Sequence, residues 1–149
     1  MLLATFTALA LAAAQGSDTT FAVDRGDRLE VETHRGSITV RAWSRNSVQV
    51  RGTGGPFTVD HRAGRVEVEP DWEHDQPGNI RFEISAPAWM ALELSGVNTD
   101  ITVAGTEAAL SAETVSGNIS VEGGNGIIEL ETVEGRIMVS GARGRIYAT

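Results

Sequence analysis

The feature that most constrains the fold is a repeat of apolar residues at every ninth position. In the C-terminal half, the repeat consists of Leu92, Ile101, Leu110, Ile119, Ile128, Ile137 and Ile146. When the chain is compared with itself at a shift of eighteen residues, residues 113–117 (ETVSG) match residues 131–135 (ETVEG). One structural unit is therefore eighteen residues long and contains two short segments in which apolar and polar residues alternate. Such alternation is typical of half-buried strands.

A unit of this kind cannot bury its apolar face alone, so successive units must stack. Coils stacked ~4.8 Å apart would pair their backbone groups and bring equivalent apolar side chains into contact. The sequence therefore predicts an all-β, single-stranded parallel β-solenoid (β-helix-like), with about 18 residues per coil and two short strands in each. Right-handed coiling is expected, because parallel crossovers within a sheet are overwhelmingly right-handed. A left-handed helix with a six-residue period fits less well, since it would turn Glu107, Glu113 and Glu131 inward.

The regularity of the repeat changes along the chain. Residues 87–149 are expected to form regular 18-residue coils, and residues 20–86 are expected to form less regular ones. Within residues 20–86, the nine-residue step is still visible between Leu29 and Ile38. The last segment matches only the start of a coil, so the array is predicted to be incomplete at the C-terminus. An open coil end either continues in a longer chain or pairs edge to edge with another chain.

Residues 1–14 (MLLATFTALALAAA) are expected to form a signal peptide. The apolar run over residues 2–14 is too short to span ~30 Å of hydrocarbon as a helix. It ends in three alanines, which supply a small-x-small cleavage site. Residues 15–149 are then expected to be the mature β-solenoid domain, which is secreted, periplasmic or at the cell surface, with no membrane span after cleavage. The chain has no cysteine, which excludes a disulfide framework and a thiolate metal site.

Charge is unevenly distributed along the chain, whose net charge is −8. Residues 66–134 contain fourteen acidic residues and one arginine, whereas residues 24–65 contain eight arginines and five acidic residues. Nucleic-acid binding requires clustered positive charge that neutralises phosphates. The acidic central region therefore argues against a nucleic-acid partner and is expected to form a solvated face.

Residues 70–79 (PDWEHDQPGN) interrupt the repeat, and their prolines and glycine predict a loop. The candidate binding residues in this loop are Asp71, Trp72, Glu73, His74 and Asp75. An aromatic ring beside carboxylates can stack on a sugar ring while the carboxylates bond its hydroxyl groups. We therefore expect contact with a glycan or with a cell-surface or envelope protein. The alternative is a turn in which Trp72 packs against the coil edge and the acids are only solvated.

No metal or cofactor site is predicted. Glu113 and Glu131 occupy equivalent positions in successive coils and are expected to lie ~5 Å apart on the outer face. Ca²⁺ needs six or more oxygen ligands, and no repeated Asp supplies them. Trp43 and Trp89 follow predicted strands and are expected to pack at coil corners.

No catalytic residues are predicted either. The three histidines are scattered, and none has the spacing to Ser or Asp that a catalytic arrangement needs. Right-handed β-helices can carry polysaccharide-degrading sites, but those sites extend across several longer coils. The chain is therefore expected not to be an enzyme, and a polysaccharide-acting enzyme is the least favoured alternative.

An ordered set of segments resembles the bacterial putative-adhesin family. The set consists of residues 29–40 (LEVETHRGSITV), the pair Ala86 and Pro87 before a strand, and repeats of the form Thr-Val-x-Gly-x-Ile-x-Val. The resemblance extends over about residues 21–149 and implies an exported β-solenoid domain with a role in adhesion or envelope contact. We therefore expect an exported, non-enzymatic, adhesin-like binding module of the cell envelope. The alternative is a structural or assembly solenoid that pairs through its open coil end.

Overall fold

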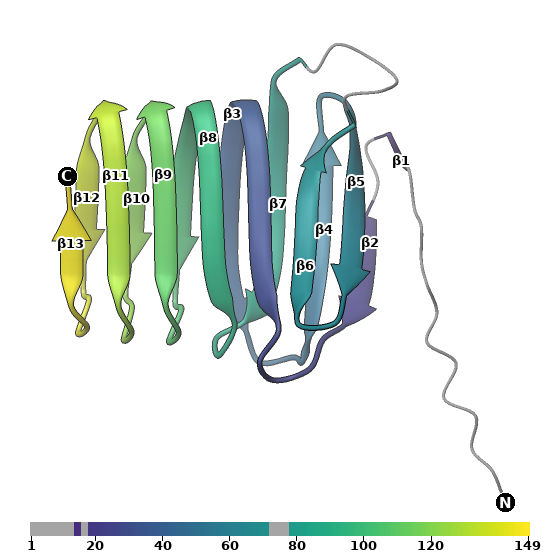
Figure 1. The fold of residues 1–149 in the computed structure, drawn as a ribbon, viewed down its shortest axis with the longest axis horizontal. Coiled ribbons are helices and arrows are strands. Elements are labelled where there is room, and N and C mark those ends of the chain that lie inside the picture. Colours follow the sequence, from purple (N-terminus) through teal and green to yellow (C-terminus); the bar gives the residue numbers. More distant parts are fainter. Residues whose placement is uncertain (1–13, 16–17, 72–77) are drawn as a thin grey trace, which may run out of the picture.

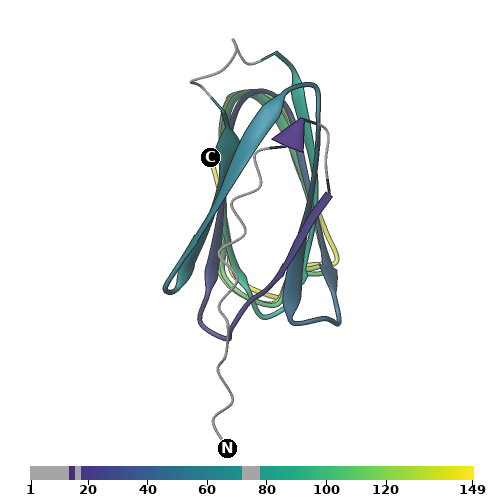
Figure 2. The same ribbon diagram turned by 90° about the vertical axis from the view of Figure 1, so that its right-hand side faces the viewer.

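The computed structural model describes residues 14–15, 18–71 and 78–149 (Figure 1). These residues form strands and no helix, so the prediction of an all-β chain is confirmed. Thirteen strands are linked by hydrogen bonds into one open sheet that does not close on itself. The sheet folds over into two faces, and the apolar core lies between them (Figure 2). No helix in the described part of the chain could cross a membrane.

The strands follow one another with short connections. They are β1 (Ala14–Gln15), β2 (Asp18–Ala22), β3 (Arg28–Trp43), β4 (Ser47–Thr53), β5 (Pro56–Arg62), β6 (Arg65–Pro70), β7 (Ile80–Pro87), β8 (Ala91–Ala104), β9 (Leu110–Ser116), β10 (Ile119–Glu122), β11 (Ile128–Glu134), β12 (Ile137–Ser140) and β13 (Ile146–Ala148).

The long strands β3 and β8 bend at the upper edge of the molecule in Figure 1, so each contributes to both faces. Gly36 lies at the bend of β3 with a φ of 126°. A Cβ atom at this position would overlap the backbone carbonyl of Ile80 on the neighbouring strand β7, so only glycine fits. One face contains β5, β6, β9, β11, β13 and the first halves of β3 and β8. The other contains β2, β4, β7, β10, β12 and the second halves of β3 and β8.

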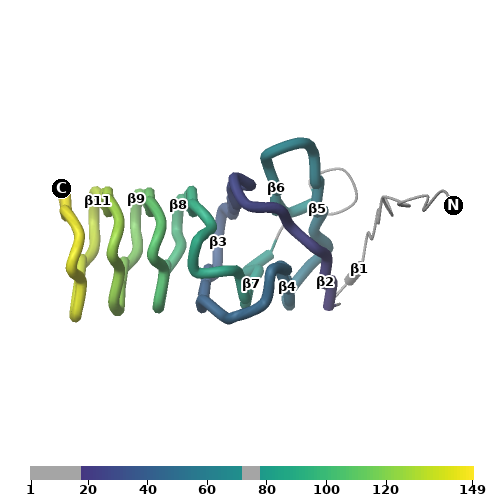
Figure 3. The backbone as a smooth tube through the Cα atoms, turned by 90° about the horizontal axis from the view of Figure 1, so that it is seen from below, coloured from purple at the N-terminus to yellow at the C-terminus, as the bar shows by residue number. Residues whose placement is uncertain are grey.

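From β8 onward, neighbouring strands pair in parallel and their partners are eighteen residues apart. Leu92 pairs with Leu110, and Ile101 pairs with Ile119. Seen from below, these coils follow one another at even spacing (Figure 3). The paired apolar residues point inward, and Ile101, Ile119 and Ile128 are fully buried. Each side chain of this size that leaves water contributes roughly 1.5–3 kcal/mol to folding.

The expectation of parallel pairing throughout is wrong for the N-terminal part, so the sheet is mixed. β1 pairs antiparallel with β5, β5 with β6, β2 with β4, and β4 with β7. For β5 and β6, the physical reason is the length of the connection between them. Only Ala63 and Gly64 separate β5 from β6, and Gly64 has a φ of 79°. Two-residue connections with positive φ favour an antiparallel hairpin, whereas a parallel pair needs a longer crossover.

Candidate binding surfaces

The outer surface of the first face carries a concentration of carboxylates, which we call the acidic face. Alternation along β3 buries Leu29 and Val31 and turns Glu30 and Glu32 outward. Because the strands are in register, Glu30 lies between Glu67 of β6 and Glu93 of β8. Local alternation thus decides which side chains face outward, and strand pairing brings them together.

A shallow groove of about 350 Å³ crosses β6, β3, β8 and β9 on this face. Six glutamates line it: Glu30, Glu32, Glu67, Glu69, Glu93 and Glu113. The strand backbone at Val31, Val68 and Leu94, whose side chains point into the core, forms its floor together with Ser95 and Ser111. The groove therefore offers hydrogen-bond acceptors and negative charge along a row of strands.

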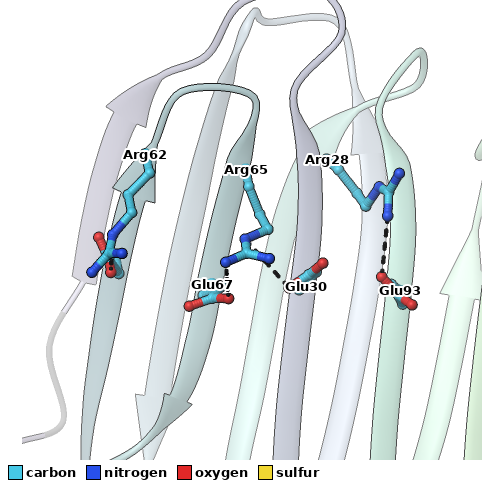
Figure 4. A network of polar contacts seen from close by, with 7 residues as sticks. Arg28, Glu30, Arg62, Arg65, Glu67 and Glu93 are labelled. Carbon is cyan, nitrogen blue, oxygen red and sulfur yellow. Dashed lines mark ion pairs between the residues drawn. The ribbon is translucent and has the colours of Figure 1, made fainter.

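A row of arginines lies between the glutamates and the turns that Figure 1 draws at the lower edge; in Figure 4 these turns are at the top, so the arginines stand above the glutamates. Arg65 lies 2.9 Å from Glu67 and 3.7 Å from Glu30, and Arg28 lies 3.5 Å from Glu93 (Figure 4). All of these side chains are partly or largely exposed, so each ion pair contributes at most about 1 kcal/mol. The arginines compensate the charges of Glu30, Glu67 and Glu93. The other glutamates of the groove form no ion pair with a described arginine: Glu32, Glu69 and Glu113.

Two carboxyl groups on the acidic face have a raised pKa. Burial raises the pKa of Glu69, and the nearby charges of Glu32, Glu67 and Asp60 raise it further. Burial also raises the pKa of Glu30, although Arg65 opposes that rise. No group of three or more His, Cys, Asp or Glu side chains within the described residues is arranged to hold a metal ion. The groove is therefore a repulsive surface of spread carboxylates, with no ligand set for a cation.

A second candidate surface lies at the lower turns, and we call it the Trp–Arg cluster: Arg25, Trp43, Arg45 and Trp89. The guanidinium carbon of Arg25 lies 5.9 Å from the ring centroid of Trp89, and that of Arg45 lies 5.3 Å from the ring centroid of Trp43. Both arginines are exposed and both tryptophans are half-buried. These distances allow cation–π attraction of about 0.5–1 kcal/mol for each pair at an exposed site.

Hydrogen bonds fix the two indole rings and join three turns. Trp43 Nε1 donates to the carbonyl of Ser47 at 2.7 Å, and Trp89 Nε1 donates to Asn46 Oδ1 at 3.0 Å. The backbone N–H of Val23 donates to the carbonyl of Asn46 at 3.1 Å. The turns at residues 23–27, 44–46 and 88–90 therefore meet at one corner of the molecule.

The structure describes only one of the five predicted loop residues. Asp71 directly follows β6, is half-buried, and its N–H donates to the carbonyl of Pro56 at 2.9 Å. The other four, Trp72, Glu73, His74 and Asp75, lie outside the described residues. The predicted stacking of glutamates is confirmed, because Glu113 and Glu131 pair in register and are both exposed.

The sequence also predicted that Trp43 and Trp89 pack at corners, and both are half-buried beside turns. It did not predict that Arg25 and Arg45 lie over their rings. A partial signal is present for Arg45, which follows Trp43 by two residues in a short polar turn. Nothing in the repeat places Arg25 beside Trp89, because these residues are brought together by the irregular N-terminal strands.

No known family model matches the sequence, and no curated protein matches it either. Solved structures resemble the chain at TM-scores below 0.5. A putative adhesin from Parabacteroides distasonis has a TM-score of 0.46 and 12% identity, over 89% of this chain and 69% of that one. A putative cell adhesion protein from Clostridium sporogenes has a TM-score of 0.38 and 9% identity, over 91% of this chain and 100% of that one. At these identities and TM-scores, the similarity does not establish membership of a family.

Proposed function

We propose that the chain is an exported, non-enzymatic, adhesin-like binding module of the cell envelope. In this proposal residues 1–14 are a signal peptide, and the parallel strands from β8 onward form a β-solenoid that serves as a rigid support. Secretion, periplasmic location or display at the cell surface follows from export. The resemblance of residues 29–40 and of the later repeats to the adhesin family supports this assignment.

The observation that carries the proposal is the arrangement of polar side chains on the outer surface. The polar side chains that could contact a ligand stand in rows across neighbouring strands, as at Glu30, Glu67 and Glu93. Such rows suit an extended partner, for example a glycan chain or a strand-like segment of an envelope protein. Chemistry on a small substrate instead requires a concave pocket with convergent reactive groups.

The loop at residues 71–75 remains a proposed contact region within this function, with Trp72 as the stacking group. The test is a glycan and matrix-protein binding array with purified residues 15–149, with and without Ca²⁺. A variant that lacks residues 71–78 is measured beside it. Binding that is lost in the deletion supports both the function and the loop. Binding that persists in the deletion supports the function and excludes the loop, and a folded protein that binds nothing contradicts the function.

A second candidate function, assembly through the coil end, is favoured by one observation. Ile146 of β13 is 42% exposed, whereas its partners in the preceding coils, Ile128 and Leu110, are 0% and 1% exposed. Among the described strands, β13 pairs only with β11, so its other edge has free backbone groups. Sedimentation velocity over a range of concentrations tests this candidate. A monomer at all concentrations would contradict it, and a loop deletion that still associates would support it.

A further inference from the structure

We propose that the Trp–Arg cluster binds the anionic groups of an acidic polysaccharide. This inference rests on the proposed binding function and names both a site and a ligand class for it. The site is the corner at which the turns at residues 23–27, 44–46 and 88–90 meet. Its functional groups are the guanidinium groups of Arg25 and Arg45, supported by the rings of Trp89 and Trp43.

These two arginines differ in their partners from four other arginines on the surface. Arg28, Arg51, Arg62 and Arg65 each lie within 4.0 Å of a carboxylate. Within the part of the chain that the structure describes, Arg25 and Arg45 form no such ion pair and contact indole rings instead. Their N–H donors therefore remain available to a ligand.

The acids in the adjoining turns form no ion pair with Arg25 or Arg45 among the described residues. Asp27 Oδ2 accepts the backbone N–H of Asp24 at 2.9 Å and lies 3.3 Å from His61 Nε2. Asp24 and Glu107 are exposed in adjoining turns, and neither forms an ion pair with a described arginine. The positive charge of the cluster is thus not neutralised by direct contact.

The geometry matches the chemistry of carboxylate and sulfate groups. A guanidinium group held beside an aromatic ring still has its five N–H donors in the plane of the fork, where they can bond an anion with two parallel hydrogen bonds. Contact with the ring also reduces the number of side-chain conformations that must be lost on binding. The exposed parts of the two half-buried indoles offer apolar surface to a sugar ring.

The charge of the whole chain favours a polysaccharide over other polyanions. With a net charge of −8, most of the surface would be repelled by an anionic membrane or by the dense phosphates of a nucleic acid. An acidic polysaccharide carries its anionic groups on sugar rings, so a corner that combines guanidinium groups with exposed indole surface can bind a short stretch of it without approach of the acidic face.

The test is binding of the full chain to immobilised polygalacturonate, with heparin, dextran, a single-stranded oligonucleotide and phosphatidylglycerol vesicles as separate probes. Arg25→Gln/Arg45→Gln is compared with the matched control Arg62→Gln/Arg65→Gln, which removes the same charge from ion-paired arginines. We expect the first variant to weaken binding to polygalacturonate or heparin at least about tenfold. The control should change it less than about twofold. Because heparin carries sulfates beside its carboxylates, tighter binding to heparin than to polygalacturonate would show that sulfate groups contribute to recognition.

Arg25→Lys/Arg45→Lys keeps the charge and loses the planar fork, so its binding should be intermediate. In a Trp72→Phe background, quenching of tryptophan fluorescence by the polysaccharide reports on Trp43 and Trp89, the two tryptophans that remain. Equal binding by both double Gln variants, or preference for vesicles or oligonucleotide, would overturn the inference. If the acidic polysaccharides do not bind but another glycan or a matrix protein does, the inference fails and the binding function stands. If nothing binds to the folded chain, both fail.

Discussion

Threonine and glycine exchange places in one of the four turns at the upper edge of the coils. The first position of these turns, paired in register, is occupied by Thr33, Gly96, Thr114 and Thr132. The position three residues later is occupied by Gly36, Thr99, Gly117 and Gly135. A Cβ atom at Gly96 would overlap the side chain of Thr99, so side chains at these two positions would occupy the same volume. Each turn therefore holds one threonine, and in β8 that threonine comes second.

This arrangement predicts a compensating pair of substitutions. Gly96→Thr alone overpacks the turn and should lower the free energy of unfolding by about 1–3 kcal/mol. Thr99→Gly alone removes a buried side chain and should also destabilise. The double variant should recover most of the loss, because it reproduces the order at Thr114 and Gly117. Urea unfolding of the wild type, the two single variants and the double variant measures the coupling free energy between the two substitutions. If the two losses of stability simply add, the side chains at positions 96 and 99 do not compete for the same space.

The hydroxyl groups of these threonines support the same prediction. Thr114 Oγ1 donates to the carbonyl of Val97 at 3.2 Å, and Thr132 Oγ1 donates to that of Gly117 at 3.1 Å. Thr99 Oγ1 is buried and has no hydrogen-bond partner among the described residues. A buried hydroxyl without a partner costs about 1–3 kcal/mol. Moving the threonine to position 96 therefore gives its hydroxyl an opportunity to bond that it lacks at position 99.

Gly117 predicts a second effect at the scale of one residue. A Cβ atom there would overlap the backbone carbonyl of Thr99 in the preceding coil, which cannot move without disturbing the strand pairing. Gly117→Ala should therefore lower the free energy of unfolding by about 2 kcal/mol or more. Gly55→Ala is the control, because its Cβ would lie 3.5 Å from the flexible end of Ile80. Similar losses in the two variants, measured by urea unfolding, would count against a specific contact at Gly117.

At the scale of the strands, the acidic face predicts a dependence of stability on pH. Glu69 has a raised pKa in the folded protein, so its neutral form is favoured there relative to the unfolded chain. Its contribution to stability is therefore full below the ordinary pKa of 4.5 and is lost as the pH rises through the raised value. Glu69→Gln should stabilise the protein near neutral pH, by less than about 1 kcal/mol because the side chain is exposed.

The advantage of Glu69→Gln should disappear below pH 4.5, where the wild-type carboxyl is also neutral. Urea unfolding at a series of pH values measures this difference. Glu107→Gln removes the same charge from a lower turn outside the groove and serves as the control. An advantage of Glu69→Gln that persists unchanged at low pH would show that it does not arise from ionisation.

How far the sequence predicts the strands depends on how far apart their partners lie. From β8 onward each coil pairs with its immediate neighbour, so the repeat gives both the strands and their register, as for Leu110 and Ile128. Leu29 instead pairs with Val66 and with Leu92, because hairpins are inserted between β3 and β8. Alternation shows that Leu29 faces inward, and it contains no information about which strand lies beside it.

The candidate sites could likewise be predicted only where the repeat relates their residues. Glu113 and Glu131 are related by the repeat, so their pairing could be predicted. Glu30, Glu67 and Glu93 are not related by it, and their groove emerges only from the pairing of β6, β3 and β8. The Trp–Arg cluster likewise depends on three turns whose contact is set by the irregular strands.

At the scale of the whole molecule, the last coil combines an exposed apolar end with opposite charges at its two edges. Figure 1 draws the end of β11 at the upper edge and the turn between β12 and β13 at the lower edge. Glu131 and Glu134 of β11, with Arg136 after them, therefore lie toward the upper edge with acids in excess, and Arg143 and Arg145 lie in the lower turn. If two copies meet through this end about a two-fold axis perpendicular to the faces, β13 pairs antiparallel with its equivalent. The upper edge of each copy then lies beside the lower edge of the other, so acids face arginines. A two-fold axis along the strands would instead bring the arginines of both copies together.

This arrangement predicts that association can be abolished and restored by charge. Arg143→Glu/Arg145→Glu makes both edges acidic, and Glu131→Lys/Glu134→Lys makes both edges positively charged, so each variant alone should lose self-association through like-charge repulsion. An equimolar mixture should associate again, because the acidic edges of one variant meet the positive edges of the other. Sedimentation velocity of each variant and of the mixture measures this, with Arg62→Glu/Arg65→Glu, far from the coil end, as the control. A mixture that remains monomeric while the wild type associates would exclude this pairing, and association of each variant alone would show that the apolar end acts without the charges.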